Sequence, residues 1–241
     1  MKLLVATDAH IFRTPDGKHW AKSIYGYSFW TRYLRIFDSV RVVARVKDVQ
    51  DIDVKKLLVD GDGVEIVGIP FYQGPKQLVM QYAKIQRRLK GVDLGCDAAL
   101  LRMPSQTATM VWRHLRKDIP LAGEIVYDMM DDVNLPGQSP IIKMLHVITS
   151  NNMKKFCLKA NGVSYVTEYS IQKHYPSYAG LHGESKEHFD SFYSTITLSE
   201  NAFTGARNFD DCKGLTLVLS SVAMNSERKG EKILIEAVKI C

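Results

Sequence analysis

The sequence lacks the short motifs that define several large classes of protein. Its four cysteines, Cys96, Cys157, Cys212 and Cys241, lie far apart, so none has the C-x-x-C spacing of a zinc site or redox centre. No G-x-G-x-x-G turn follows the first apolar run, which excludes the usual dinucleotide fingerprint. Internal repeats and low-complexity tracts are also lacking. We therefore expect reduced thiols, no bound metal ion and no cofactor.

Long apolar runs are lacking as well. No stretch approaches the roughly 18 apolar residues that a membrane span needs. The apolar run at the N-terminus is too short for a signal peptide, and Asp8 interrupts it. We therefore expect a cytoplasmic protein.

One segment is compatible with a membrane surface. Residues 141–159 have apolar residues at helical spacing and lysines at 143, 154, 155 and 159. A basic amphipathic helix of this kind can lie on an anionic membrane, here the inner face, as a peripheral contact. The alternative is a helix that packs one face on a sheet.

The composition is that of an ordinary globular protein with a basic surface. Hydrophobic residues make up 46% of the 241 positions, and the formal net charge is +6. The excess of positive charge could bind nucleic acid, an anionic membrane or a phosphorylated substrate. It could equally be a solvated basic surface. Because no nucleic-acid-binding motif is present, we expect no nucleic-acid partner.

Short apolar runs alternate with longer amphipathic stretches along most of the chain. We expect helices at 27–37, 76–90, 105–117, 140–160 and 170–176, and strands at 3–7, 40–46, 64–69, 97–101, 124–127 and 163–167. This order predicts an α/β protein with a Rossmann-like, doubly wound and mostly parallel sheet. Residues 181–213 break the pattern and suggest a linker. A further strand is expected at 215–220, with a helix starting near Lys229.

Ligands of such sheets bind beyond the carboxyl ends of the strands, so the loops there hold the candidate residues. The first loop, residues 8–20, contains His10 and the turn at Pro15, Asp16 and Gly17. We expect either a flexible ligand loop or an ordinary surface turn. A lone histidine such as His10 is more often structural than catalytic.

The loop after the fourth strand places Arg102 and Ser105 at the start of a helix. Free backbone N–H groups there favour a phosphate or carboxylate, and an arginine can pair with it through two hydrogen bonds. The alternative is that Ser105 caps the helix and Arg102 pairs with a carboxylate of the protein.

Carboxylates follow the fifth and sixth strands. Asp128, Asp131 and Asp132 could supply a base, bind sugar hydroxyls or hold a divalent metal. A metal needs ligands from a second segment, and the sequence indicates none. A role at a helix start or turn suits Asp131 and Asp132 better than Asp128. Glu168 could bind a ligand or lie in the first turn of the next helix.

Three blocks resemble one family of enzymes. Residues 96–105 (CDAALLRMPS), 124–128 (EIVYD) and 162–168 (GVSYVTE) are similar to the N-terminal domain of retaining glycosyltransferases of family 4, also called group 1. The likeness covers almost the whole chain and is closest to bacterial members thought to build surface polysaccharides. It implies the GT-B fold, in which two Rossmann-like domains face each other. The first binds the acceptor and the second binds the nucleotide-sugar donor.

The resemblance implies a domain division. Residues 1–180 would form the acceptor domain, 181–213 a crossing segment and 214–241 the incomplete start of the donor domain. The paired-glutamate motif of the family's donor domain would lie beyond residue 241. An alternative is therefore a non-catalytic saccharide-binding module that needs a separate donor domain.

The resemblance also implies roles for particular residues. Asp128 is the catalytic candidate, and Arg228 and Lys229 would bind the donor diphosphate, although Ser220 and Ser221 replace the family's usual glycine there. Transfer would go to a saccharide or lipid-linked saccharide, without an essential metal. The residues expected to bind the acceptor are His10, Asp16, Gly17, Arg102, Ser105 and Glu168.

Overall fold

The structure, a computed structural model, describes residues 1–22, 24–52, 55–133, 138–194, 200–203, 205 and 231–240. The chain divides into two compact units, Met1–Ile196 and Thr197–Cys241. The first unit contains the sheet and the helices α1 to α7. In the second unit the described elements are a short 3-10 helix, Glu200–Ala202, and the helix α8, Glu231–Ile240.

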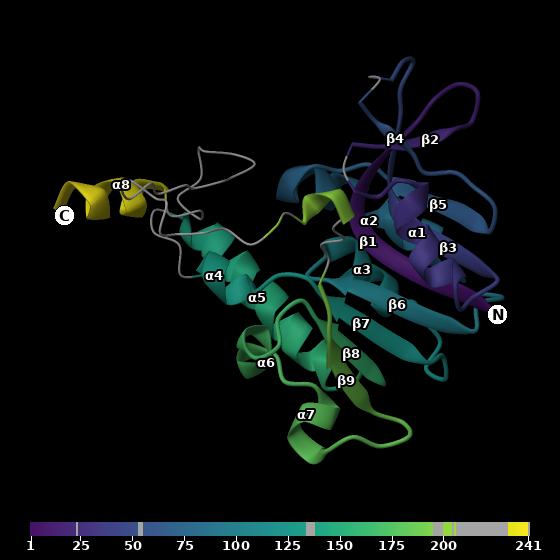
Figure 1. Ribbon diagram of the computed structural model, residues 1–241. Coiled ribbons are helices and arrows are strands. Elements are labelled where there is room, and N and C mark those ends of the chain that lie inside the picture. The colour runs from purple at the N-terminus through teal and green to yellow at the C-terminus, as the bar shows by residue number, and fades with distance from the viewer. Residues whose placement is uncertain are drawn as a thin grey trace. The chain divides into compact units, whose positions relative to one another are not determined.

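The described strands of the first unit form one mainly parallel sheet (Figure 1). The parallel strands lie in the order β5, β3, β1, β6, β7, β8, β9. This is the order of a Rossmann sheet with one further strand at its end, and it confirms the predicted fold class. The bounds are β1 Lys2–Arg13, β2 His19–Ala21, β3 Ser39–Asp48, β4 Leu57–Leu58, β5 Val64–Pro70, β6 Ala98–Met103, β7 Leu121–Ile125, β8 Gly162–Tyr165 and β9 Phe189–Phe192.

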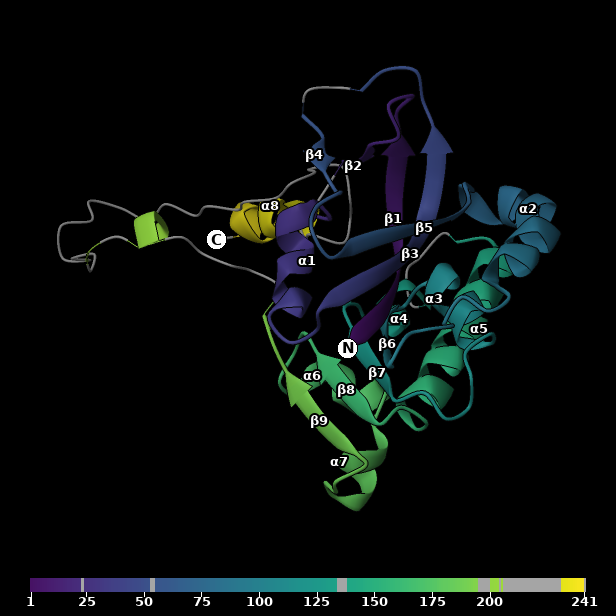
Figure 2. The same cartoon turned by 90° about the vertical axis from the view of Figure 1, so that its right-hand side faces the viewer.

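Helices cover both faces of the sheet, as a doubly wound fold requires (Figure 2). One face carries α1, and the other carries α2, α3 and α5. The bounds are α1 Tyr27–Leu34, α2 Gly74–Leu89, α3 Gln106–Trp112, α4 Met129–Val133, α5 Pro140–Cys157, α6 Ser170–His174 and α7 Tyr178–His182.

The alternation of side chains along β1 builds the two cores. Leu3 and Val5 face α1 and pack in a cluster with its Trp30. Leu4 and Ala6 point to the opposite face, into the cluster that holds the apolar residues of α2, α3 and α5. Because a strand alternates its side chains between the faces of a sheet, one apolar run serves both cores.

The long helix α5 reaches the sheet through a glycine. A Cβ added at Gly123 in β7 would lie 2.3 Å from Cε1 of Phe156, which is far inside contact distance. Phe156 is fully buried there and meets Trp112 edge to face, with ring centroids 5.3 Å apart. Gly123 therefore sets how closely α5 approaches β7.

The structure differs from the sequence prediction at the first loop. Residues 8–13 continue β1 and do not form a flexible loop, and β2 pairs antiparallel with them. The turn at Pro15, Asp16 and Gly17 closes this hairpin, with Gly17 at φ +81°. The strand continues because its residues 10–13 also pair with β3.

The structure also places a strand inside the segment predicted as a linker. β9 pairs parallel with β8 from Gly162 to Tyr165, and the first compact unit runs to Ile196. Its sequence, F-D-S-F, is too short and polar to show as an apolar run. The strand predicted at 215–220 lies outside the described residues.

Candidate functional site

A pocket of about 360 Å³ lies where the strand order reverses, between β1 and β6. This topological switch point is the usual ligand position in open α/β sheets. The volume is within the range of small-molecule sites, which is about 300–1,000 Å³. The residues around it are Asp8, Pro75, Pro104, Ser105, Gln106, Met129, Ile142, Leu145, His146 and Thr149.

Asp8 is fixed at this pocket by the start of α3. Its carboxylate accepts hydrogen bonds from Gln106 N at 3.0 Å, from Thr107 N at 3.2 Å and from Thr107 Oγ1 at 2.7 Å. The hydroxyl of Tyr72 donates a fourth, at 3.3 Å. The protein's own carboxylate therefore occupies the helix N-terminus, for which a ligand anion was one of the two expectations.

The buried surroundings of Asp8 add to this network. Nη2 of Arg45 donates to the Asp8 carbonyl oxygen at 2.5 Å, and its Nη1 donates to the Tyr72 carbonyl oxygen at 3.0 Å. Burial, with the Asp8 charge as a further cause, raises the pKa of Tyr72 well above its ordinary value. Tyr72 therefore remains a neutral hydrogen-bond donor to Asp8.

Asp128 follows β7 and pairs with a histidine. Oδ1 of Asp128 accepts a hydrogen bond from Met130 N at 2.8 Å, and Oδ2 lies 2.7 Å from Nδ1 of His174. Asp128 is only 8% exposed, whereas the His174 side chain is 49% exposed. A buried carboxylate thus holds a histidine that faces solvent.

A buried polar cluster supports this pair. The Tyr175 hydroxyl lies 3.1 Å from Oγ of Ser150 in α5, and Ser150 Oγ also contacts Sδ of Met130 at 3.6 Å. Burial raises the pKa of Tyr175 to about 12, and the Asp128 charge acts in the same direction. The cluster ties α4, α5 and α6 together around Asp128.

Sequence reasoning missed His174. It lies 46 residues from Asp128 in the chain, at the end of the short helix that follows β8. A signal was present, because β7 and β8 are neighbours and their carboxyl ends lie at one edge of the sheet. A single histidine in a five-residue helix nevertheless gives little reason to select it from sequence.

Arg102 and Ser105 make the contacts of the structural alternative. Arg102 is 3% exposed and forms an ion pair with Glu124 on the next strand, and Tyr33 also donates to Glu124 at 2.9 Å. Ser105 caps α3 by accepting a hydrogen bond from Ala108 N at 2.9 Å. Of the two, Ser105 borders the pocket. Their predicted role in acceptor binding remains a prediction.

The other predicted acceptor residues are spread over the first unit. His10 packs on Phe71 with ring centroids 5.1 Å apart, and burial, together with Arg45, lowers its pKa. Asp16 lies in the exposed hairpin turn beside Gly17 and accepts from Thr14 Oγ1 at 2.5 Å. Exposed Glu168 accepts a hydrogen bond from the Tyr169 hydroxyl at 2.6 Å. None of these four lines the pocket at the switch point.

The predicted donor-side residues cannot be placed. Arg228 and Lys229, like Ser220 and Ser221 before them, lie outside the described residues. Their role in binding a diphosphate remains a prediction.

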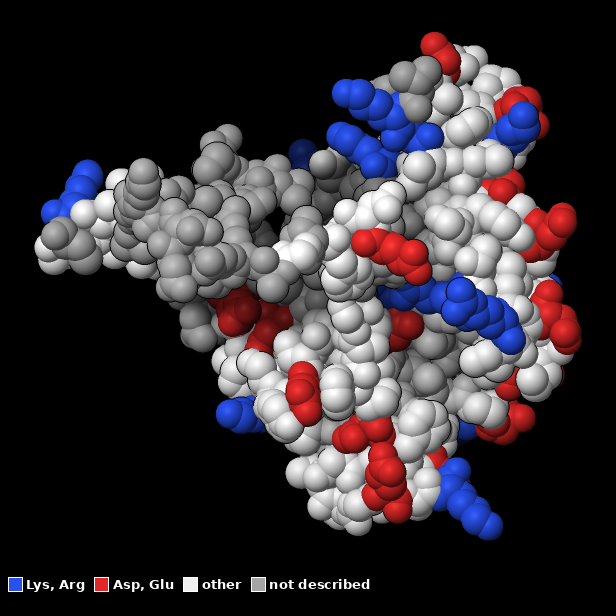
Figure 3. Space-filling view, viewed as in Figure 1, with Lys and Arg blue, Asp and Glu red and all other residues white. Residues whose placement is uncertain are grey.

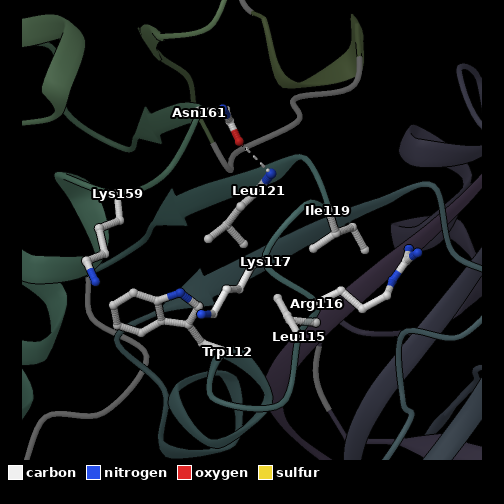
Figure 4. Close-up of a pocket in the computed structure, with 8 residues that line it drawn as sticks. All are labelled: Trp112, Leu115, Arg116, Lys117, Ile119, Leu121, Lys159 and Asn161. Atoms are coloured by element: carbon white, nitrogen blue, oxygen red, sulfur yellow. Dashed lines mark hydrogen bonds between the residues drawn. The ribbon is translucent and has the colours of Figure 1, made fainter.

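A second pocket, of about 330 Å³, lies at the opposite edge of the sheet (Figure 4). It adjoins the start of β7, where Leu121 N donates to Oδ1 of Asn161 at 3.0 Å. Three basic side chains border it, from Arg116, Lys117 and Lys159. Arg116 pairs with Asp93, and Lys159 follows the C-terminal end of α5, where a cation balances the helix dipole, so both have a structural reason.

The charge distribution, the helices and the cysteines bear on the expectations about membranes, metals and thiols. On the face shown in Figure 3, basic side chains gather over the end that carries β2 and β4, and the two signs are interspersed elsewhere. Among the described helices, none has the length and apolar character needed to cross a membrane. In the same part of the chain, no three His, Cys, Asp or Glu side chains gather as a metal site. Cys96 and Cys157 are buried and free.

Comparison with known proteins finds a curated relative of the chain. No family model matches the chain. Protein CapJ of Staphylococcus aureus is 26% identical to it over 250 aligned positions, which cover 99% of this chain and 61% of CapJ. The chain therefore spans about 61% of the length of that relative.

Proposed function

We propose that the chain is the acceptor-side part of a retaining glycosyltransferase of family 4 with the GT-B fold. It would act in surface-polysaccharide synthesis, with a nucleotide-sugar as donor and a saccharide or lipid-linked saccharide as acceptor. The observation that carries the proposal is the pocket at the switch point of a sheet with the Rossmann order.

The three blocks that resemble the family are neighbours in space, which supports the proposal. Residues 96–105 include β6 and the cap of α3, residues 124–128 end at Asp128, and residues 162–168 include β8. Because β6, β7 and β8 are adjacent and parallel, the three blocks end at one edge of the sheet. The resemblance therefore gathers at the edge that holds the pocket.

The pocket has the chemistry of a site for one sugar ring. Apolar side chains of Ile142, Leu145 and Met129 form its walls, and polar groups of Asp8, Gln106 and Thr149 lie among them. Within the described part of the chain, Nδ1 of His146 is buried and has no hydrogen-bond partner. Apolar walls with a few polar groups are typical of small-molecule sites.

Blocking the pocket tests this function. Methyl hexopyranosides should bind the wild-type chain in titrations followed by NMR, and Ile142→Trp at the pocket should weaken binding about tenfold or more. Ile141→Trp is the matched control, because Ile141 is the preceding residue of α5, is 67% exposed and does not line the pocket. Equal binding by both variants, or no binding by the wild type, would contradict the proposal.

The same titrations separate an enzyme from a binding module. An enzyme should also bind UDP-glucose or GDP-mannose at millimolar concentration. It should hydrolyse the nucleotide-sugar slowly, which releases the free sugar. Saccharide binding without any nucleotide binding would favour the non-catalytic module that needs a separate donor domain.

We also propose a peripheral membrane contact through 141–159, at the inner face. The N-terminal half of α5 leaves Ile141, Met144 and Ile148 largely exposed beside Lys143, whereas Met153 and Phe156 of the other half are buried. Exposed apolar residues next to a lysine suit an anionic lipid surface. Sedimentation with phosphatidylglycerol vesicles should carry the protein down, and Met144→Glu should abolish this. Equal sedimentation of the variant would contradict the contact.

A further inference from the structure

We infer that His174, rather than Asp128, contacts the acceptor saccharide, and that Asp128 is the residue that positions it. This inference rests on the proposed function and deepens it by naming the ligand-facing side chain. Sequence reasoning chose Asp128 from its place after β7. The contacts of Asp128 and His174 now distinguish their roles.

Asp128 is poorly accessible to a ligand. Its Oδ1 accepts a hydrogen bond from Met130 N at 2.8 Å, and its Oδ2 lies 2.7 Å from Nδ1 of His174. The residue is 8% exposed, so a sugar could reach only a small part of it. Burial and its bond to His174 therefore suit Asp128 to positioning that histidine rather than to contacting a sugar.

His174 has the opposite character. A carboxylate only accepts hydrogen bonds, so Nδ1 of His174 must carry the hydrogen in this pair. In the neutral ring, Nε2 is then a hydrogen-bond acceptor. No hydrogen bond reaches Nε2 from any residue that the structure describes, and 49% of the side chain is exposed. A sugar hydroxyl is a donor that fits this nitrogen.

The position of His174 also fits a saccharide that occupies the pocket. The pair is anchored on α4, where Met130 N binds Asp128 and the preceding residue, Met129, lines the pocket. Ser150, which contacts Met130, follows pocket residue Thr149 in α5. The pocket and the pair are thus successive sites along the carboxyl edge of β6, β7 and β8. A saccharide longer than one ring could meet both.

The tautomer of His174 provides the first test. Nitrogen-15 NMR of the wild-type chain should show neutral His174 protonated at Nδ1, and Asp128→Asn should shift the population toward the Nε2–H form, because an amide can donate to Nδ1. His182 is the matched control. It also ends a five-residue helix, α7, and no carboxylate pairs with it in the described residues. A wild-type His174 with the same tautomer mixture as His182 would overturn the inference.

Titration with methyl hexopyranosides provides the second test. Their addition should move the imidazole signals of His174 and not those of His182, and His174→Ala should weaken binding about tenfold, as expected for one lost hydrogen bond. Asp128→Asn should also weaken binding, with thermal unfolding close to that of the wild type. His174→Gln should restore part of the affinity, and His182→Ala should have no effect.

The possible failures are distinguishable. In one outcome, Ile142→Trp removes hexoside binding, but binding does not move the His174 signals and His174→Ala keeps the wild-type affinity. This outcome would overturn the role of His174 alone. This result is expected if the Asp128–His174 pair only holds α6 against α4 and does not contact the ligand. No binding of any hexoside would overturn the proposed function together with this inference.

Discussion

Asp8 and Asp128 are two aspartates at the same edge of one sheet, and their neighbours give them different roles. Four donors from α3 and Tyr72 surround the carboxylate of Asp8. Asp128 binds one backbone N–H and one histidine, and that histidine faces solvent. The position of a carboxylate in the topology therefore does not determine its function. Its function depends on the hydrogen-bond donors that contact it.

Removing Asp8 should have the largest effect on stability. Asp8→Ala leaves the first N–H groups of α3 and the buried hydroxyl of Thr107 without this acceptor. Losing a helix-terminal acceptor and leaving buried donors unpaired should reduce the free energy of unfolding by about 2–4 kcal/mol. Urea unfolding followed by circular dichroism measures this change. If Asp8→Ala reduced the free energy of unfolding by less than Asp128→Ala does, the structural role would belong to Asp128 and not to Asp8.

Removing Asp128 should cost less stability and more function. Asp128→Ala loses the bond to Met130 N and the pair with His174, which should reduce the free energy of unfolding by about 1–2 kcal/mol. In an enzyme completed by a donor domain, we expect the same variant to abolish transfer. Transfer at the wild-type rate, with an unchanged fold, would exclude Asp128 from the site.

The alternation of strands and helices could be predicted from sequence because it follows from local patterns. The apolar runs at Leu3–Thr7, 40–46 and 64–69 alternate with helical spacing, and this alternation is sufficient to predict a doubly wound sheet. The alternatives stated for Arg102 and Ser105 also describe their observed contacts. Capping and ion pairing involve residue types that are common at such positions.

The contacts that define the site were not predictable in the same way. The Asp128–His174 pair joins residues 46 positions apart, and Asp8 reaches across 98 positions to Gln106. No pattern in a short window contains such pairs. The extension of β1 to Arg13 was missed because polar Asp8 and His10 interrupt its apolar run, although pairing with β3 and β2 keeps these residues in the strand.

His10, on which the charge of Asp8 acts, allows a finer test through pH. Burial, together with the Arg45 charge, lowers the pKa of His10 below its ordinary value of 6.5, while Asp8 opposes this. The unfolded chain then binds the proton more readily than the folded one, so His10 should reduce stability as the pH falls below 6.5. His10→Gln should remove this part of the slope in urea unfolding at a series of pH values. An unchanged slope would show that His10 does not contribute to it.

The smallest effect is expected at Asp16, which the sequence predicts as an acceptor-binding residue. It lies in the hairpin turn, where Thr14 Oγ1 and Lys18 N donate to it. Its side chain is 52% exposed, so water can replace these bonds, and it does not line the pocket. Asp16→Ala should therefore leave both the urea midpoint and the hexoside affinity at wild-type values. A loss of affinity with unchanged stability would mean that the hairpin reaches the acceptor and that Asp16 contacts the ligand.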